Sequence, residues 1–156
     1  MPQGDKSEYT EECKDGYNAP RVLLVEDNHI AMRVAESIVS SAKCLVQSAS
    51  DGEQALSLAQ SNDFDLVITD LGLPGISGYD FTRQLRAWEM ARNKKPMPIV
   101  GLTAHLELNT QTTCLQSGMN DVFSKPITLN MMQKILTNYL STTEPQTDLV
   151  RGIIKL

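Results

Sequence analysis

Short aliphatic runs alternate with longer amphipathic segments along most of this chain, and this alternation decides its fold class. The aliphatic runs lie at 21–26, 44–49, 66–70, 98–104 and 121–124. Segments with helical spacing follow them at 28–41, 52–60, 78–90, 109–117 and 128–139. Continuous aliphatic strands separated by helices are typical of a parallel sheet covered on both faces. Because such crossovers are right-handed, we expect a doubly wound α/β fold, a three-layer sandwich.

Apolar spacing also predicts which helical side chains face the sheet. The predicted buried positions are Ile30, Val34, Ala35 and Ile38 in the first helix, and Phe81, Leu85, Trp88 and Met90 in the third. Asp51, with Gln54 three residues later, predicts a capped start for the second helix. Thr128 predicts a capped start for the last one.

Length and composition limit the class of protein. With 156 residues and 41% hydrophobic residues, the chain is the size of one domain with a real core. Its net charge is −5 and it has no run of five basic residues, so we expect no direct contact with nucleic acid or a membrane. Cys13, Cys44 and Cys114 are widely spaced, which favours a reducing cytoplasm over a disulfide framework or a zinc site. We expect Cys44 and Cys114 to pack in the interior.

The periodic pattern covers only part of the chain. Residues 1–20 are polar and acidic without periodicity, which predicts a flexible linker. We expect one folded domain over residues 21–140. The pattern is lost after Leu140, and residues 141–156 are expected to be a tail or a short docked element. No apolar run reaches the ~18 residues that cross a bilayer, and residues 1–20 lack the apolar stretch of a signal peptide.

Polar residues stand at the carboxyl ends of four predicted strands. They are Glu26 and Asp27, then Asp70, Thr103 and Lys125. In doubly wound sheets, ligands bind at this edge, where the strand order reverses. If the first and third strands are neighbours, three carboxylates converge, and they repel one another unless a cation lies among them. Hard oxygen donors with room for water suit Mg²⁺.

These groups together match the chemistry of phosphoryl transfer. A metal and the Lys125 ammonium would neutralise phosphoryl oxygens, the Thr103 hydroxyl would donate to one, and Asp70 would be the nucleophile. Taken singly, each has an ordinary explanation: Asp27 as a helix cap, Asp70 in a turn, Thr103 as a strand former, Lys125 as a solvated charge. Four strand ends that carry the groups of one reaction favour the joint interpretation.

The segments VLLVEDN, LVITDLGLPGISGYD, IVGLTA and GMNDVFSKPI, in this order, resemble the motifs of two-component response-regulator receiver domains over about residues 21–140. The resemblance implies a flavodoxin-like (βα)5 fold with strand order 2-1-3-4-5. It implies phosphorylation of Asp70, with Thr103 and Lys125 holding the phosphoryl group. It also implies Mg²⁺ bound by the residues Glu26, Asp27, Asp70 and, through its carbonyl, Gly72.

The resemblance further implies a phosphohistidine donor, on a histidine kinase or a histidine phosphotransfer protein. Phosphorylation would then shift the surface formed by residues 109–117, 121–124 and 128–139. No independent enzyme is expected from this domain beyond self-catalysed phosphotransfer and slow dephosphorylation. GMNDVFSKPI and the acidic lead-in resemble the receiver at the C-terminus of hybrid sensor histidine kinases. A stand-alone response regulator is the alternative.

Three positions bear on switching and on phosphoryl lifetime. The family usually has an aromatic residue three positions before its lysine, where this chain has Val122. Phe123 is adjacent, but strand alternation sends it to the other face of the sheet. A binding module that works without phosphorylation therefore stays open. Gly72 and His105 flank the site, and we expect them to affect how water reaches the phosphoryl group.

Two other classes of protein fit the residues at the strand ends less well. A phosphatase of the haloacid-dehalogenase type would need a second aspartate where this chain has Gly72. A flavodoxin-like cofactor carrier would place its phosphate against Glu26 and Asp27, where like charges repel.

Overall fold

A computed structural model describes residues 19–140 of the chain. The predicted C-terminal tail and residues 1–18 of the predicted linker lie outside this part. At its start, the Pro20 carbonyl accepts a hydrogen bond from the Leu45 amide at 2.8 Å. Within residues 19–140, no helix is both long and apolar enough to span a bilayer.

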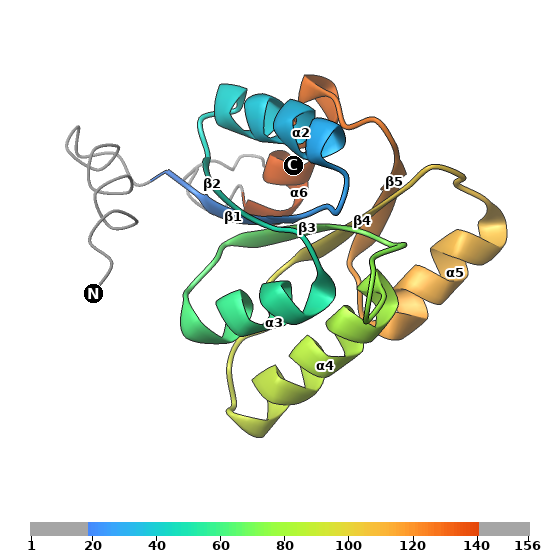
Figure 1. The fold of residues 1–156 in the computed structure, drawn as a ribbon. Helices are drawn as coiled ribbons and strands as arrows, with labels where there is room; N and C mark the ends of the chain where they lie inside the picture. The colour runs from blue at the N-terminus through green and yellow to red at the C-terminus, as the bar shows by residue number, and fades with distance from the viewer. Residues whose placement is uncertain (1–18, 141–156) are drawn as a thin grey trace, which may run out of the picture.

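The core of the fold is a five-stranded parallel sheet with the order β2-β1-β3-β4-β5 (Figure 1). This is the strand order that the resemblance to receiver domains implies. The strands are β1 (Arg21–Val25), β2 (Leu45–Ala49), β3 (Leu66–Asp70), β4 (Ile99–Thr103) and β5 (Asp121–Ser124). The order reverses between β1 and β3, so the carboxyl ends of these two strands form the switch point.

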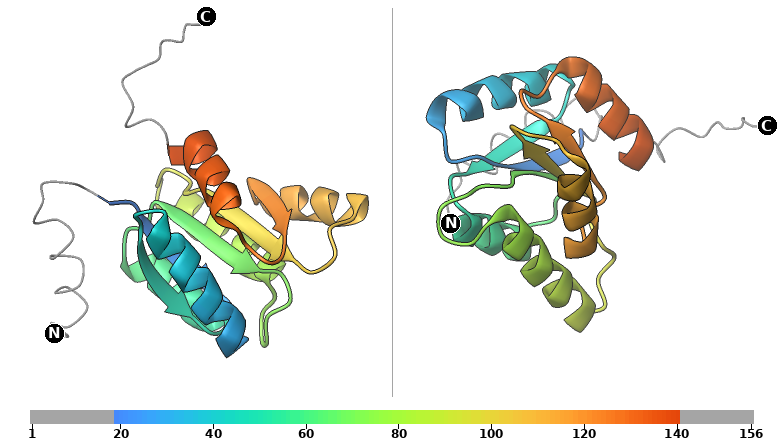
Figure 2. Two further views of the ribbon diagram at one scale, coloured as in Figure 1. Left: turned by 90° about the horizontal axis from the view of Figure 1, so that it is seen from above. Right: turned by 90° about the vertical axis from the view of Figure 1, so that its right-hand side faces the viewer.

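Helices cover both faces of the sheet, as predicted for a three-layer sandwich. One face carries α2 (His29–Ser41) and α6 (Leu129–Leu140) (Figures 1 and 2). The other carries α3 (Gly52–Ser61), α4 (Gly78–Ala91) and α5 (Leu108–Ser117). The buried residues accordingly form two clusters, one on each side of the sheet. Cys44 and Cys114 are buried, one in each cluster, as expected.

Side chains cap the helices where the sequence predicts it. The Asp51 carboxylate accepts a hydrogen bond from the Gln54 amide at 2.7 Å, and the Thr128 hydroxyl accepts one from the Met131 amide at 3.2 Å. α5 differs, because its N-cap residue Glu107 makes no side-chain capping bond.

The predicted buried faces of two helices are partly wrong. Ile30 is 77% exposed and Val34 48% exposed, while Ala35 and Val39 face the sheet. Ala35 and Val39 are four residues apart and share one face of the helix, whereas Val34 lies about 100° around α2 from Ala35. Met90 is 80% exposed, because it lies about 100° around α4 from the buried Glu89.

A buried charge joins α4 to the loop that precedes β5. Glu89 is only 2% exposed, and its carboxylate forms an ion pair with Arg86 at 2.7 Å. The other Glu89 oxygen accepts a hydrogen bond from the Met97 amide at 2.9 Å. Arg86 also donates to the Gly118 carbonyl and to the Asn120 side chain. This network fixes the C-terminal end of α5 against α4.

Candidate functional site

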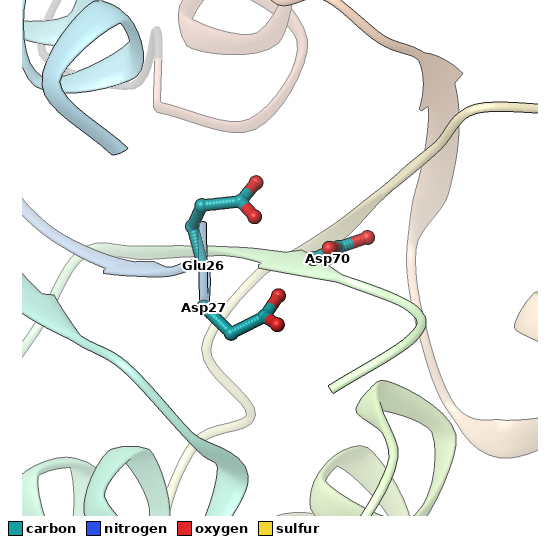
Figure 3. A group of neighbouring side chains, drawn as sticks. All are labelled: Glu26, Asp27 and Asp70. Carbon is teal, nitrogen blue, oxygen red and sulfur yellow. The ribbon is translucent and has the colours of Figure 1, made fainter. Parts of the chain in front are cut away.

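Three carboxylates meet where the sheet reverses its order. Asp70 is the last residue of β3, and Glu26 and Asp27 follow β1 directly. Val25 pairs with Thr69, so the two strands end at the same level. Carboxylate oxygens of the three residues lie within 4.8 Å of one another (Figure 3). Glu26 is buried, Asp70 is half-buried and Asp27 is exposed, so the group opens to solvent on the Asp27 side.

Local hydrogen bonds hold the turn after β1. The Glu26 amide still donates to the Ala49 carbonyl of β2 at 3.0 Å, which extends the strand direction to this residue. Asn28 then caps α2, because its side-chain oxygen accepts from the Ala31 amide at 2.9 Å. The Asn28 amide donates to the Glu26 carboxylate at 3.1 Å. Asn28 therefore does the capping, and the Asp27 carboxylate is not used for it.

Lys125 lies between two of the carboxylates. Its Nζ atom is 2.9 Å from Glu26 Oε1 and 3.4 Å from Asp70 Oδ2. Burial alone would lower the pKa of Lys125, but the Glu26 hydrogen bond and the charges of Asp70 and Glu26 outweigh it and raise the pKa. The ammonium group is therefore charged at neutral pH.

The Glu26–Lys125 ion pair is the part of the site that the sequence did not indicate. The sequence predicts that Lys125 contacts the phosphoryl group and that Glu26 contacts the metal, and nothing in residue spacing indicates that the two side chains contact each other. The contact arises because β1 and β5 end at the same edge of the sheet, and Glu26 and Lys125 are the residues that follow them directly. Lys125 is closer to Glu26 than to the predicted phosphoacceptor Asp70.

The loop after β3 folds back tightly beside Asp70. The Gly78 amide donates to the Leu71 carbonyl at 2.9 Å, and a Cβ atom at Gly78 would collide with the Asp70 carbonyl. Gly72, the predicted carbonyl ligand, has open space around the position that a Cβ would take. A side chain at position 72 would therefore meet no neighbouring atoms.

Thr103 lies at the same edge of the sheet, at the end of β4. Asp70 pairs with Leu102, so Thr103 is one residue further along the neighbouring strand. Its hydroxyl accepts a hydrogen bond from the His105 amide at 3.2 Å, and its carbonyl accepts one from the Lys125 amide at 2.7 Å. The hydroxyl thus binds the following loop in this structure, while the His105 side chain is exposed.

Val122 and Phe123 point to opposite faces of the sheet, as strand alternation predicts. Val122 is 6% exposed and belongs to the cluster under α3, α4 and α5, where it pairs with Gly101. Phe123 packs in the cluster under α2 and α6. Phe123 therefore cannot take the place of an aromatic residue at position 122.

The net charge of the site favours the binding of a divalent cation. Glu26, Asp27 and Asp70 carry three negative charges and Lys125 one positive charge, which leaves −2. Across residues 19–140, this is the only group of at least three histidine, cysteine, aspartate or glutamate side chains close enough to hold one metal ion. Its donors are all carboxylate oxygens, the ligand type that Mg²⁺ prefers.

The model of the response regulator receiver domain family matches residues 22–137. Sensor histidine kinase GacS of Pseudomonas protegens is 36% identical over 121 residues, which cover 78% of this chain and 13% of GacS. Sensor histidine kinase RcsC of Escherichia coli K12 is 30% identical over 127 residues, covering 81% of this chain and 13% of RcsC. The chain thus spans about an eighth of the length of these relatives.

Solved structures agree with the sequence relatives. The receiver domain of sensor histidine kinase PA1611 from Pseudomonas aeruginosa PAO1, which has a magnesium ion in its active site cleft, is 35% identical with a TM-score of 0.70; the match covers 80% of this chain and 99% of that one. A co-crystal structure of the Saccharomyces cerevisiae histidine phosphotransfer protein Ypd1 with the receiver domain of Ssk1 matches with a TM-score of 0.77 at 28% identity, over 83% of this chain and 95% of that one. Family model, relatives and fold agree, and this chain belongs to the response regulator receiver domain family.

Proposed function

We propose that this domain accepts a phosphoryl group from a phosphohistidine onto the Asp70 carboxylate, in a two-component or phosphorelay system. One observation carries the proposal. In a chain of the receiver family, Glu26, Asp27, Asp70 and Lys125 come from three separate strand ends and meet in one half-open site.

The chemistry is a direct transfer between two side chains. An Asp70 oxygen attacks phosphorus and forms a P–O bond, the P–N bond to the donor imidazole breaks, and the imidazole leaves with the electron pair and takes a proton. The Lys125 ammonium, already 3.4 Å from Asp70 Oδ2, neutralises charge on the phosphoryl oxygens. Thr103 turns its hydroxyl from the His105 backbone toward the phosphoryl group.

We propose Mg²⁺ as the cation of this site. Glu26, Asp27 and Asp70, with the carbonyl of Gly72, would hold it, and the exposed position of Asp27 leaves room for coordinated water. When bound, the ion would offset the negative charge that gathers during transfer. The net charge of −2 in this structure fits one divalent ion.

We propose that the domain is the receiver module of a hybrid sensor histidine kinase in the cytoplasm, and that its partner is a histidine kinase or histidine phosphotransfer protein. GacS and RcsC are named sensor histidine kinases, and the domain would occupy a small part of such a chain. Residues 1–20 would be its linker and residues 141–156 a tail or docked element. A stand-alone response regulator is the alternative.

A binding module that works without phosphorylation is a second candidate, because of one observation. Val122 fills the position of the usual aromatic switch residue and is buried. At this position, α5, β5 and α6 therefore have no aromatic ring that could move between two positions. The intact Asp70, Thr103 and Lys125 favour the phosphoacceptor.

Intact-mass measurement after incubation with acetyl phosphate and Mg²⁺ tests the proposal. We expect the mass of one added phosphoryl group, and no addition in Asp70→Asn or when the metal is chelated. Asp121→Asn is the matched control, because Asp121 lies on β5 outside the acidic group, and it should be modified normally. Unmodified wild-type protein under these conditions would favour the phosphorylation-independent module.

A further inference from the structure

A groove lies at the end of the sheet opposite the carboxylates. Its volume is about 590 Å³, and three segments line it: residues 63–65 before β3, residues 94–98 before β4, and the last two residues of α6. In Figure 1 the amino-terminal ends of β1 and β3 lie on the left side of the molecule, and the connection into β4 rises from the end of α4. The floor of the groove includes Phe64, Met97, Pro98, Tyr139 and Leu140, so much of its surface is apolar.

A basic loop forms one wall of this groove. Arg92, Lys94 and Lys95 follow one another closely after α4, and all three are exposed. The Arg92 guanidinium and the Lys94 ammonium lie over the Trp88 ring, 5.4 and 5.3 Å from its centre. Within residues 19–140, this loop forms one ion pair, between Lys94 and Asp63 at 3.7 Å, and 92% of the Asp63 side chain is exposed. The loop therefore has excess positive charge beside an aromatic ring.

The chain enters the domain next to this groove. The Arg21 amide, at the start of β1, donates to the Asp65 carboxylate at 2.8 Å, and Asp65 lines the groove. A segment that precedes Pro20 therefore starts within reach of the groove. Five extended residues span up to about 17 Å, which is long enough for the chain between positions 15 and 20 to reach across the ends of the neighbouring strands.

The preceding segment has the complementary charge. Between residues 5 and 15 it carries five acids, Asp5, Glu8, Glu11, Glu12 and Asp15, against Lys6 and Lys14. Its net charge is −3, opposite in sign to the loop at residues 92–95. It also contains Tyr9, and Tyr17 lies just beyond, so aromatic rings are available for the apolar floor.

We propose that residues 5–15 of this chain dock in the groove at the amino-terminal end of the sheet, with their acids against the basic loop of residues 92–95. The docked segment covers the apolar floor and fixes the direction in which the chain enters the domain. The site is remote from Asp70, so the proposal does not depend on phosphoryl transfer.

The chain carries a natural pair of probe positions for this contact. Trp88 is the only tryptophan and lies under the basic loop. Cys13 lies inside the segment, whereas Cys44 and Cys114 are buried. Burial, with the Asp65 charge, raises the pKa of Cys44 to about 11, and burial raises the pKa of Cys114. A thiol-reactive energy acceptor should therefore label Cys13 selectively.

Energy transfer from Trp88 to the acceptor on Cys13, in the full chain, tests the proposal. We expect efficient transfer at low salt that falls by about half or more at 1 M salt, where the Debye length shrinks to about 3 Å. The triple variant Glu8→Gln, Glu11→Gln, Glu12→Gln should lose transfer at low salt. The variant Lys6→Gln, Lys14→Gln, in the same segment, should keep or increase it.

A second pair of variants tests the groove side. Lys95→Glu, which leaves the two cations over Trp88 in place, should reduce transfer, while Lys134→Glu on α6 makes the same charge change elsewhere and should not. Transfer that is unaffected by salt and by the acid-to-amide changes would overturn the proposal. So would transfer that rises with protein concentration, because it would assign the groove to a second copy.

Discussion

At the scale of single residues, the site is an unbalanced group of charges. Lys125 pairs with Glu26 and Asp70, whereas Asp27 makes no ion pair within residues 19–140. Its carboxylate lies within 4.8 Å of both other acids. Without a bound cation, this arrangement costs folding free energy through repulsion between like charges. A residue that destabilises the fold and serves no capping role is typical of a functional site.

Asp27→Asn should therefore stabilise the metal-free protein. Two like charges about 4 Å apart in water repel by about 1 kcal/mol, so we expect a gain of about 0.5–1 kcal/mol in the free energy of unfolding. Urea unfolding in the presence of a chelator measures it. Mg²⁺ at 100 times its dissociation constant should stabilise the wild type by about 2.7 kcal/mol, and the variant much less. Equal stabilisation of both proteins would remove Asp27 from the proposed metal site.

At the scale of secondary-structure elements, the helices differ in how firmly they are held. The Arg86–Glu89 ion pair ties the end of α4 to Gly118 and Asn120, just beyond α5. α5 itself buries only Cys114 and Ser117, both in its C-terminal half, and lacks a side-chain N-cap. α5 is thus anchored at its end near β5 and weakly held at its beginning, close to Thr103.

Removal of the Arg86 anchor should be costly. Arg86→Ala leaves the Glu89 charge buried without its partner, so we expect a loss of about 3–5 kcal/mol in unfolding free energy. Arg83→Ala is the matched control one turn earlier: its ion pair with Asp80 is about half exposed, and its loss should cost less than about 1 kcal/mol. Chemical denaturation of both variants measures the difference. Similar losses of unfolding free energy in Arg86→Ala and Arg83→Ala would show that the buried Arg86–Glu89 pair stabilises the fold no more than the exposed pair does.

The sequence predicts the strands and helices and their succession along the chain better than it predicts which face of each helix is buried. Aliphatic strands and the caps at Asp51 and Thr128 depend on local chemistry, which residue spacing records. In α2, apolar spacing predicts that Ile30 and Val34 are buried, but Ala35 and Val39 are the buried residues, because spacing alone does not decide which apolar row of a helix packs on the sheet. The acids could be assigned to one edge from topology, but the contact of Lys125 with Glu26 needed three-dimensional structure.

At the scale of the whole molecule, the two ends of the sheet have different features. The carboxyl ends of β1 and β3 hold the acids, and the opposite end holds the groove and the basic loop. The Thr103 hydroxyl already contacts the loop that leads into α5, through His105. If a phosphoryl group on Asp70 binds the Thr103 hydroxyl, the hydrogen bond from the His105 amide is lost, and the loop that leads into α5 is released.

Hydrogen exchange should locate this response. On phosphorylation we expect changed exchange of the backbone amides of residues 104–113, because this part of α5 is weakly held, and unchanged exchange in α3 on the same face. Mass spectrometry of treated and untreated protein measures both segments, with Asp70→Asn as the control. Unchanged exchange in residues 104–113 of a fully phosphorylated sample would contradict a conformational change that runs through Thr103 and His105. It would support a domain that does not switch at α5.

The chemical identity of the modified residue tests the central claim most directly. Hydride reduction of an aspartyl phosphate converts the side chain to that of homoserine, which peptide mass spectrometry can place in the sequence. After treatment with acetyl phosphate and Mg²⁺, we expect homoserine at position 70 alone. Homoserine at another aspartate, the corresponding alcohol at a glutamate, or an unreduced phosphoryl group on a hydroxyl or histidine side chain would contradict the assignment to Asp70.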